Sequence, residues 1–172
     1  KNDIEMHLSA HKTLLFSHGY NIHYKLIKPK DDCNVIMVAP SGPGDAVRKK
    51  YQEGSGIPNL IAIEQDVTSN ALDIALSYSK AIGGTRTCAF KSTFKEETET
   101  DLFGEQVVLT GIYPRIIKES FKVLLEDGYS PVVAWFVCFY EVKNIVDLLS
   151  DKGIDYMFKA VSETAEYGGQ TR

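Results

Sequence analysis

The run Asn34-Val-Ile-Met-Val-Ala39 constrains the fold more than any other part of the sequence. A continuous run of apolar and β-branched residues is typical of a strand that is buried on both faces. The run ends at Pro40-Ser-Gly-Pro-Gly44, and residues 46–53 then follow a helical pattern. A strand, a tight turn and a helix in this order predict a sheet that is covered by helices.

The rest of the chain divides into two halves of different character. Strands are also predicted at 13–17, 59–64 and 85–90, with helices over 3–11 and 69–81. Strands that alternate with helical patterns indicate parallel βαβ units. Further on, only helical periodicity remains, over 94–110, 114–127, 133–150 and 151–160, interrupted by Gly111, Gly128 and Gly153. We predict an α/β layer followed by an all-α layer, with no helix at the very end of the chain.

Composition excludes several classes of protein. Apolar residues make up 44% of the chain, which is enough to bury a core, and the net charge is −4. This charge argues against broad binding to nucleic acid or to an acidic membrane surface. No apolar run approaches the ~20 residues of a membrane span, and no secretory signal is visible, so we expect a cytoplasmic protein. Cys33, Cys88 and Cys138 are odd in number and widely spaced, which predicts buried free thiols.

A helix over 94–110 would place Glu97, Asp101 and Glu105 in one stripe, at positions i, i+4 and i+8. Three carboxylates in a stripe repel one another unless a cation lies there, and oxygen ligands suit Mg²⁺. The alternative is a helix N-terminus, with Thr93 and Glu96 as a capping box and the first acids complementing the helix dipole. Asp101 and Glu105 lie beyond the first turn, where the dipole explanation loses force. Both interpretations stay open on spacing alone.

Three other features could carry chemistry. His18 ends a predicted strand, at the edge where ligand clefts of α/β proteins form, whereas His7 and His11 are expected on a solvated helical face. The turn Pro40–Gly44 precedes a helix, where main-chain amides can meet a phosphate. Glu141 interrupts an apolar stretch and is expected on a helix surface.

Taken together, these segments resemble the ketol-acid reductoisomerases, also called acetohydroxyacid isomeroreductases. The resemblance is carried by five strings in the order of that family: Ser17-His-Gly-Tyr-Asn-Ile-His23, Val35-Ile-Met-Val-Ala-Pro-Ser-Gly-Pro-Gly44, Phe94-Lys-Glu-Glu-Thr-Glu-Thr-Asp-Leu-Phe-Gly-Glu-Gln106, Glu141-Val-Lys-Asn-Ile-Val-Asp147 and Ser162-Glu-Thr-Ala-Glu-Tyr-Gly168. It implies the C-terminal part of a Rossmann-type NADP-binding domain over residues 1–92. It also implies part of a helical, knotted domain over residues 93–172.

The resemblance further implies an enzyme of branched-chain amino-acid biosynthesis. Its reaction is an alkyl migration in a 2-acetolactate-type substrate, followed by reduction to a 2,3-dihydroxy acid. Two Mg²⁺ ions polarise the oxygens of the 2-acetohydroxy acid, and NADPH supplies the hydride.

The site residues that the resemblance implies can be named by position. They are Asp101 and Glu105 as metal ligands, Glu141 as a further carboxylate, Ser162 as a substrate contact, His18 as the active-site histidine and Gly44 as a cofactor contact. In short members of the family the site forms across a homodimer. Glu141 and Ser162 are then expected to face Asp101 and Glu105 of the other subunit.

The sequence departs from the family pattern at three positions. Val137 stands where a glutamate is usual, Ser41 replaces a lysine, and Tyr140 replaces a histidine. The family's glycine-rich pyrophosphate loop would precede Lys1, and its closing helices would follow Arg172. These departures predict a weakened second metal position and little turnover by this chain alone. The alternative function is a catalytically impaired remnant or paralogue that acts as a fold or as an oligomerisation partner.

Overall fold

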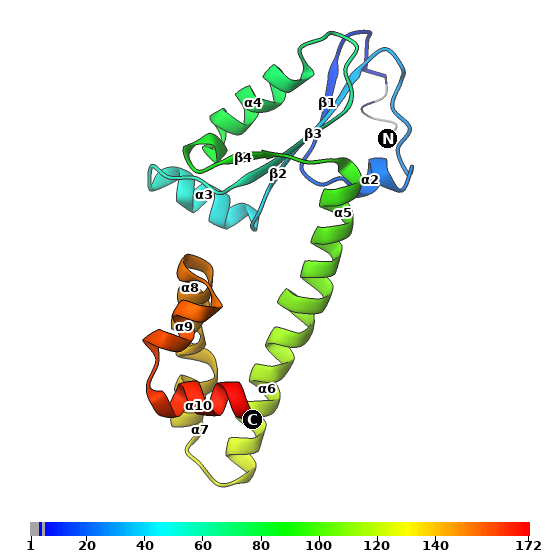
Figure 1. Ribbon diagram of the computed structural model, residues 1–172. Coiled ribbons are helices and arrows are strands. Elements are labelled where there is room, and N and C mark those ends of the chain that lie inside the picture. Colours follow the sequence, from blue (N-terminus) through cyan, green and yellow to red (C-terminus); the bar gives the residue numbers. More distant parts are fainter. Residues whose placement is uncertain (1–3, 5) are drawn as a thin grey trace. The chain divides into compact units, whose positions relative to one another are not determined.

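A computed structural model describes residue 4 and residues 6–172 of the chain, which form two compact units, Lys1–Gly104 and Glu105–Arg172. The first unit contains a four-stranded sheet in the order β1-β2-β3-β4 (Figure 1). Its strands are β1 (Thr13–Phe16), β2 (Asn34–Pro40), β3 (Asn59–Gln65) and β4 (Ala89–Lys91). All four predicted strands are confirmed, but β4 is short because the 3₁₀ turn η1 (Gly84–Arg86) occupies the start of the predicted segment.

The sheet is mixed, so the prediction of parallel βαβ units throughout is wrong. β1 pairs with β2 and β3 pairs with β4 in parallel, but β2 and β3 run antiparallel, with Pro40 opposite Asn59. The connection between them holds α3 (Gly44–Gln52), in which no residue is buried. A parallel return requires a crossover that covers one face of the sheet, and α3 buries none of its residues.

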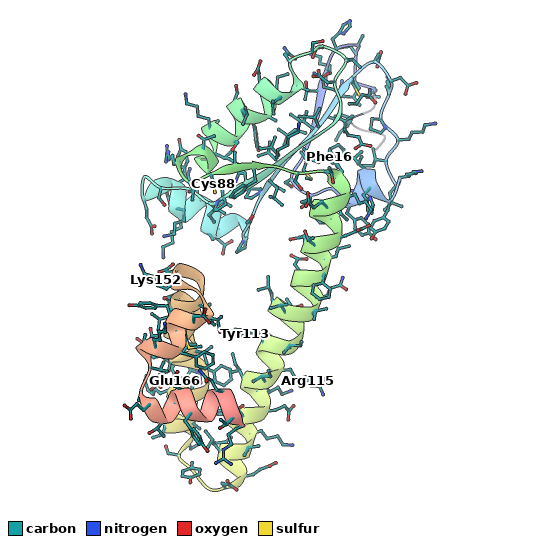
Figure 2. The ribbon with its side chains drawn as sticks, viewed as in Figure 1. Phe16, Cys88, Tyr113, Arg115, Lys152 and Glu166 are labelled. Carbon is teal, nitrogen blue, oxygen red and sulfur yellow. The ribbon has the colours of Figure 1, made fainter. Side chains whose placement is uncertain are left out.

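β2 is buried on both faces, as its apolar run predicts, and its side chains alternate between two clusters. One cluster contains Val35, Met37 and Ala39 of β2, Ile22 of α2 (Tyr20–His23) and Phe94 of α5 (Phe94–Phe103). The other contains Ile36 and Val38 of β2 with Ala71 and Ala75 of α4 (Ala71–Ala81). Phe16, labelled in Figure 2 at the end of β1, makes an edge contact with Phe94, with ring centroids 6.3 Å apart. The start of α5 is therefore packed against the sheet.

The second unit is all-helical, as predicted. It comprises α6 (Tyr113–Glu126), α7 (Pro131–Trp135), η3 (Phe136–Tyr140), α8 (Val142–Lys152), α9 (Ile154–Ala160) and α10 (Glu163–Thr171), after η2 (Gly104–Ile112) that follows α5. The continuous α-helices predicted over 94–110 and 133–150 are wrong in detail, because η2 and η3 are π-helical. Gly111 lies within η2 rather than ending a helix, and a Cβ there would be 2.2 Å from the carbonyl oxygen of Gln106.

Both ends of the chain differ from the prediction. α10 was not expected, because Gly168 and Gly169 lower the helical propensity of the segment that contains it. The helix predicted over 3–11 is not found in residues 6–11, which contain turns, and His11 has a φ of 66°. His7 and His11 therefore share no helical face, while residues 3 and 5 lie outside the described residues. Across the part of the chain that is described, no helix has both the length and the apolar character to cross a membrane.

The three cysteines are free, and Cys33 and Cys138 are buried as expected, whereas Cys88 is half-buried just before β4 (Figure 2). Burial raises the pKa of the Cys33 thiol, which donates a hydrogen bond to the carbonyl of Lys30 at 3.1 Å. A raised pKa lowers the thiolate fraction at any given pH, and the thiolate is the reactive form.

We therefore expect iodoacetamide to alkylate the half-buried Cys88 faster than the buried Cys33 at pH 8. Alkylation of Cys33 should set in only at higher pH. Mass spectrometry of peptides from a time course at several pH values measures both rates. Equal rates in the folded chain would contradict the prediction, and equal rates in urea provide the control.

Candidate active site

His18 lies in the turn between β1 and α2, and a carboxylate of α5 holds its ring. Nδ1 of His18 is 2.8 Å from Oε1 of Glu97. The other oxygen of Glu97 accepts a hydrogen bond from the main-chain N–H of Gly19 at 2.7 Å. The Glu97 side chain is 4% exposed and the His18 side chain 34%. Since carboxylates are almost never buried unless they are paired, these two bonds explain how Glu97 can lie in the interior.

Gly19 allows the turn to approach α5 this closely. A Cβ on Gly19 would lie 2.4 Å from Oγ1 of Thr98 and 2.7 Å from the carbonyl oxygen of Phe94. Both distances are far below van der Waals contact, so a larger residue would push the turn away from the helix. The sequence of the turn therefore sets the distance between His18 and Glu97.

Thr93 caps the N-terminus of α5 as the sequence predicts, but Glu96 does not complete the predicted capping box, because its carboxylate bonds to Ser92. Oγ1 of Thr93 accepts a hydrogen bond from the main-chain N–H of Glu96 at 3.0 Å. The Glu96 carboxylate, in turn, accepts from the hydroxyl of Ser92 at 2.8 Å. This cap fixes the start of the helix, and with it the positions of Glu97 and Asp101 one turn apart.

Asp101 completes a group of three side chains that could hold a metal ion. Its Oδ2 is 3.4 Å from Nδ1 of His18, and the side chain is 44% exposed. One ligand atom each from His18, Glu97 and Asp101 lies within 4.8 Å of the others. Because Glu97 is already hydrogen-bonded, the exposed oxygens of Asp101 are the ones available to a cation. Chemically, the group offers an oriented imidazole beside a free carboxylate.

The other predicted site residues lie elsewhere. Gly44 is the first residue of α3, exposed, with no atom within 4 Å of the position of a Cβ. Glu105 and Glu141 are exposed residues of the second unit, in η2 and just after η3. Ser162 caps α10 by accepting from the N–H of Ala165 at 3.2 Å. The predicted stripe assumes one α-helix through position 105, but the helix changes to π geometry at Gly104.

Glu97 was predicted as part of the carboxylate stripe, but its role as the partner of His18 and Gly19 was missed. Its position in the first turn of α5 was explained by the helix dipole, which requires an exposed side chain. The one available signal was its spacing, four residues before Asp101 on the same helical face. Its burial against the turn after β1 depends on a contact between residues 78 positions apart, which no local pattern contains.

A second histidine and carboxylate pair, His23 and Glu99, joins α2 to α5. Nε2 of His23 is 3.2 Å from Oε1 of Glu99, and Lys95 donates a hydrogen bond to Oε2 of Glu99 at 2.5 Å. The hydrogen bond from Lys95, with smaller contributions from the charge of Lys95 and from His23, lowers the pKa of Glu99. Glu99 is exposed and His23 half-buried, so solvent partly screens the pair, and it serves α2 and α5 as a weak surface contact.

A cavity of about 650 Å³ lies near the start of α5, and none of the three clustered side chains lines it. Its wall contains cations at Lys25, Lys28 and Lys95 and acids at Asp31 and Glu64. The candidate site therefore depends on the side-chain cluster around His18 and not on this cavity.

Comparison with known proteins places this chain in a family. Residues 1–88 match the family model "Acetohydroxy acid isomeroreductase, NADPH-binding domain", and residues 94–172 match "Ketol-acid reductoisomerase, C-terminal domain". The chain is 54% identical over 172 residues to the "Ketol-acid reductoisomerase (NADP(+))" of Methanocaldococcus jannaschii. The match covers 100% of the chain and 52% of the relative, so the chain spans about half the length of that curated relative.

Comparison with solved structures points to the same family. An NADH-preferring ketol-acid reductoisomerase from an uncultured archean is 46% identical, with a TM-score of 0.93 over 98% of this chain and 51% of that one. A crystal structure of a putative oxidoreductase from Jannaschia sp. is only 12% identical, with a TM-score of 0.67 over 99% of this chain and 64% of that one, and shows the fold alone. Two family models match the two parts of the chain, and a relative with this activity in its name is 54% identical over the whole of it. The chain therefore belongs to the ketol-acid reductoisomerase family.

Proposed function

We propose that this chain carries the catalytic histidine and metal-ligand region of a ketol-acid reductoisomerase. The reaction is the alkyl migration of a 2-acetolactate-type substrate and its reduction by NADPH to a 2,3-dihydroxy acid, in branched-chain amino-acid biosynthesis. The observation that carries the proposal is the cluster of His18, Glu97 and Asp101 in a chain of this family.

The donor set fits Mg²⁺. Asp101 and Glu105 are exposed carboxylates, and hard cations of this kind take oxygen ligands. When bound, Mg²⁺ would polarise the substrate oxygens on the carbons between which the alkyl group migrates and at the carbonyl that is reduced. Both oxygens of the Glu97 carboxylate are hydrogen-bonded, one to His18 and one to Gly19, so its role is to hold the imidazole in place. Of the two metal positions of the family, the second is weakened here because Val137 cannot bind an ion.

The remaining site residues follow the family resemblance. Glu141 and Ser162 would supply a further carboxylate and a substrate contact from the second subunit of a homodimer, and both side chains are exposed. His18 would face the substrate through Nε2, the ring nitrogen that is not bonded to Glu97. Together these groups would orient the substrate and hold its charge, which is where most of the rate enhancement of such reactions arises.

The cofactor would bind to the first unit. The main-chain amides that begin α3 and the open space beside Gly44 fit a phosphate of NADP(H). The family match over residues 1–88 is to an NADPH-binding domain, which supports this assignment. We assign residues 1–92 to that partial Rossmann domain and residues 93–172 to part of the knotted helical domain.

The test is the oxidation of NADPH, followed by its absorbance, with 2-acetolactate and Mg²⁺. We expect any oxidation to require all three components and to disappear in Asp101→Asn. Because Ser41 and Val137 replace functional residues of the family, the rate should stay below the ordinary enzyme range of about 1–10³ s⁻¹. Oxidation that persists without Mg²⁺, or in Asp101→Asn, would contradict the proposal.

One observation favours the alternative of an oligomerisation partner. The second unit exposes a run of large apolar side chains, each between 41% and 58% exposed: Trp135, Phe136, Val137, Phe139 and Tyr140. Contiguous apolar surface of this size is rare on monomers and marks an interaction site. A chain without turnover that still assembles through this surface would fit this function better.

We expect the chain to form a dimer at tens of micromolar concentration, through the apolar surface of the second unit. Phe136→Glu should shift the equilibrium toward monomer, because it introduces a charge that assembly would bury. Lys49→Glu, a charge reversal on exposed α3 of the first unit, is the control and should leave the dimer intact. Sedimentation velocity measures both, and a compact monomer for the unaltered chain would refute the expectation.

A further inference from the structure

We propose that the main-chain N–H of Gly19, acting through Glu97, decides which ring nitrogen of His18 carries the proton. In this assignment Nδ1 is protonated and Nε2 keeps its lone pair. Gly19 and Glu97 are then positioning residues, and the consequence for catalysis rests on the function proposed above. The proton position itself is a property of the first unit and can be measured without any ligand.

The groups around Nδ1 leave it only one role. Oε1 of Glu97 lies 2.8 Å away and Oδ2 of Asp101 lies 3.4 Å away, and both are carboxylate oxygens. A carboxylate accepts hydrogen bonds and has none to donate, so Nδ1 must be the donor. In a neutral imidazole the proton on Nδ1 leaves Nε2 as an acceptor. Among the described residues, Nε2 has no hydrogen-bond partner.

Gly19 restricts one of the two Glu97 oxygens to accepting a hydrogen bond. Its N–H reaches Oε2 of Glu97 at 2.7 Å, and the hydroxyl of Thr98 approaches the same oxygen at 3.4 Å. A main-chain N–H cannot act as an acceptor, and Gly19 is buried where it meets Glu97. The side of residue 97 that faces Gly19 must therefore always be an acceptor.

This asymmetry gives a sharp expectation for glutamine at position 97. In Glu97→Gln the amide oxygen has to face Gly19, which turns the amide NH₂ toward Nδ1 of His18. Nδ1 then becomes the acceptor, and the proton moves to Nε2. Under the proposed function, the outward face of His18 changes from an acceptor for a substrate hydroxyl to a donor.

The experiment is ¹⁵N–¹H NMR of the chain labelled at histidine, without substrate, Mg²⁺ or NADPH. Spectra are taken over a series of alkaline pH values, and the ratio is read where the His18 signals no longer change with pH. The His18 signals are identified by their loss in His18→Gln. We expect the Nδ1-protonated form to exceed the other by about tenfold or more, since a hydrogen bond to a charged group contributes roughly 1.5–3 kcal/mol.

Two variants decide which contact is responsible. Glu97→Gln should reverse the ratio in favour of the Nε2-protonated form, whereas Asp101→Asn should leave it unchanged because its contact is longer. A predominantly Nε2-protonated His18 in the unaltered chain would overturn the proposal, even if Glu97→Gln failed to fold. An unchanged ratio in Glu97→Gln, or a reversal in Asp101→Asn, would also overturn it. Absence of reductoisomerase activity would leave these outcomes unaffected.

Discussion

Replacing Glu97 with alanine is expected to lower the free energy of unfolding of the first unit by about 3 kcal/mol. The change removes the acceptor for two hydrogen bonds, from His18 Nδ1 and from the N–H of Gly19. The N–H of Gly19, a buried residue, would lose its partner. An unsatisfied buried donor costs about 1–3 kcal/mol, in addition to the lost bonds to a charged acceptor.

Glu99→Ala is the matched control, since it makes the same change two residues away on the same helix. Glu99 is exposed, and its contacts with Lys95 and His23 are screened by solvent. We expect this variant to unfold close to the unaltered chain in a urea titration followed by circular dichroism. Equal midpoints for Glu97→Ala and Glu99→Ala would show that the buried contacts of Glu97 contribute nothing special to stability.

Mg²⁺ is expected to raise the unfolding temperature of the chain, and Asp101→Asn and Glu105→Gln are expected to abolish this response. An ion at 100 times its dissociation constant stabilises the folded state by about 2.7 kcal/mol. For a chain of this length that corresponds to roughly 5–10 °C. Because Val137 replaces a carboxylate of the family pattern, we expect millimolar-range binding and a smaller rise at accessible concentrations.

The measurement is thermal unfolding with MgCl₂ and with NaCl at matched ionic strength. Asp73→Asn, a loss of an exposed acid on α4, is the control and should respond to Mg²⁺ like the unaltered chain. Without Mg²⁺, Asp101→Asn should be slightly more stable than the unaltered chain, because it removes a negative charge close to Glu97. If MgCl₂ acts no more strongly than NaCl, Asp101 and Glu105 are a solvated helix face and the metal interpretation fails.

The elements that local pattern could predict were predicted well. The run from Val35 to Ala39 has no polar position on either face, and in the structure both of its faces are buried. Thr93 marks the start of α5 because its hydroxyl is placed to accept from the helix N-terminus. These features depend on neighbours in sequence, so periodicity and capping were sufficient to find them.

The π-helical segments could not be predicted from the hydrophobic periodicity of the sequence. η2 and η3 contain the same apolar and small residues as an α-helix, and each was included in a longer predicted α-helix. The difference between α and π geometry is one residue in the spacing of a hydrogen bond, which the packing of the whole helix decides. The change from α to π geometry at Gly104 lies between Asp101 and Glu105. The stripe from Glu97 to Glu105 therefore does not continue on one α-helical face.

By itself, the sequence determined the strands, most of the helices and the family, because these follow from residue types at short spacing and from ordered strings. Only the tertiary structure decided that β2 and β3 run antiparallel, since strand direction depends on whether α3 covers the sheet. Only the tertiary structure turned Glu97 from a helix-terminal acid into the partner of His18 and Gly19. The physical reason is the same in both cases: burial and hydrogen bonding between segments far apart in the chain set the energy, and no local pattern carries them.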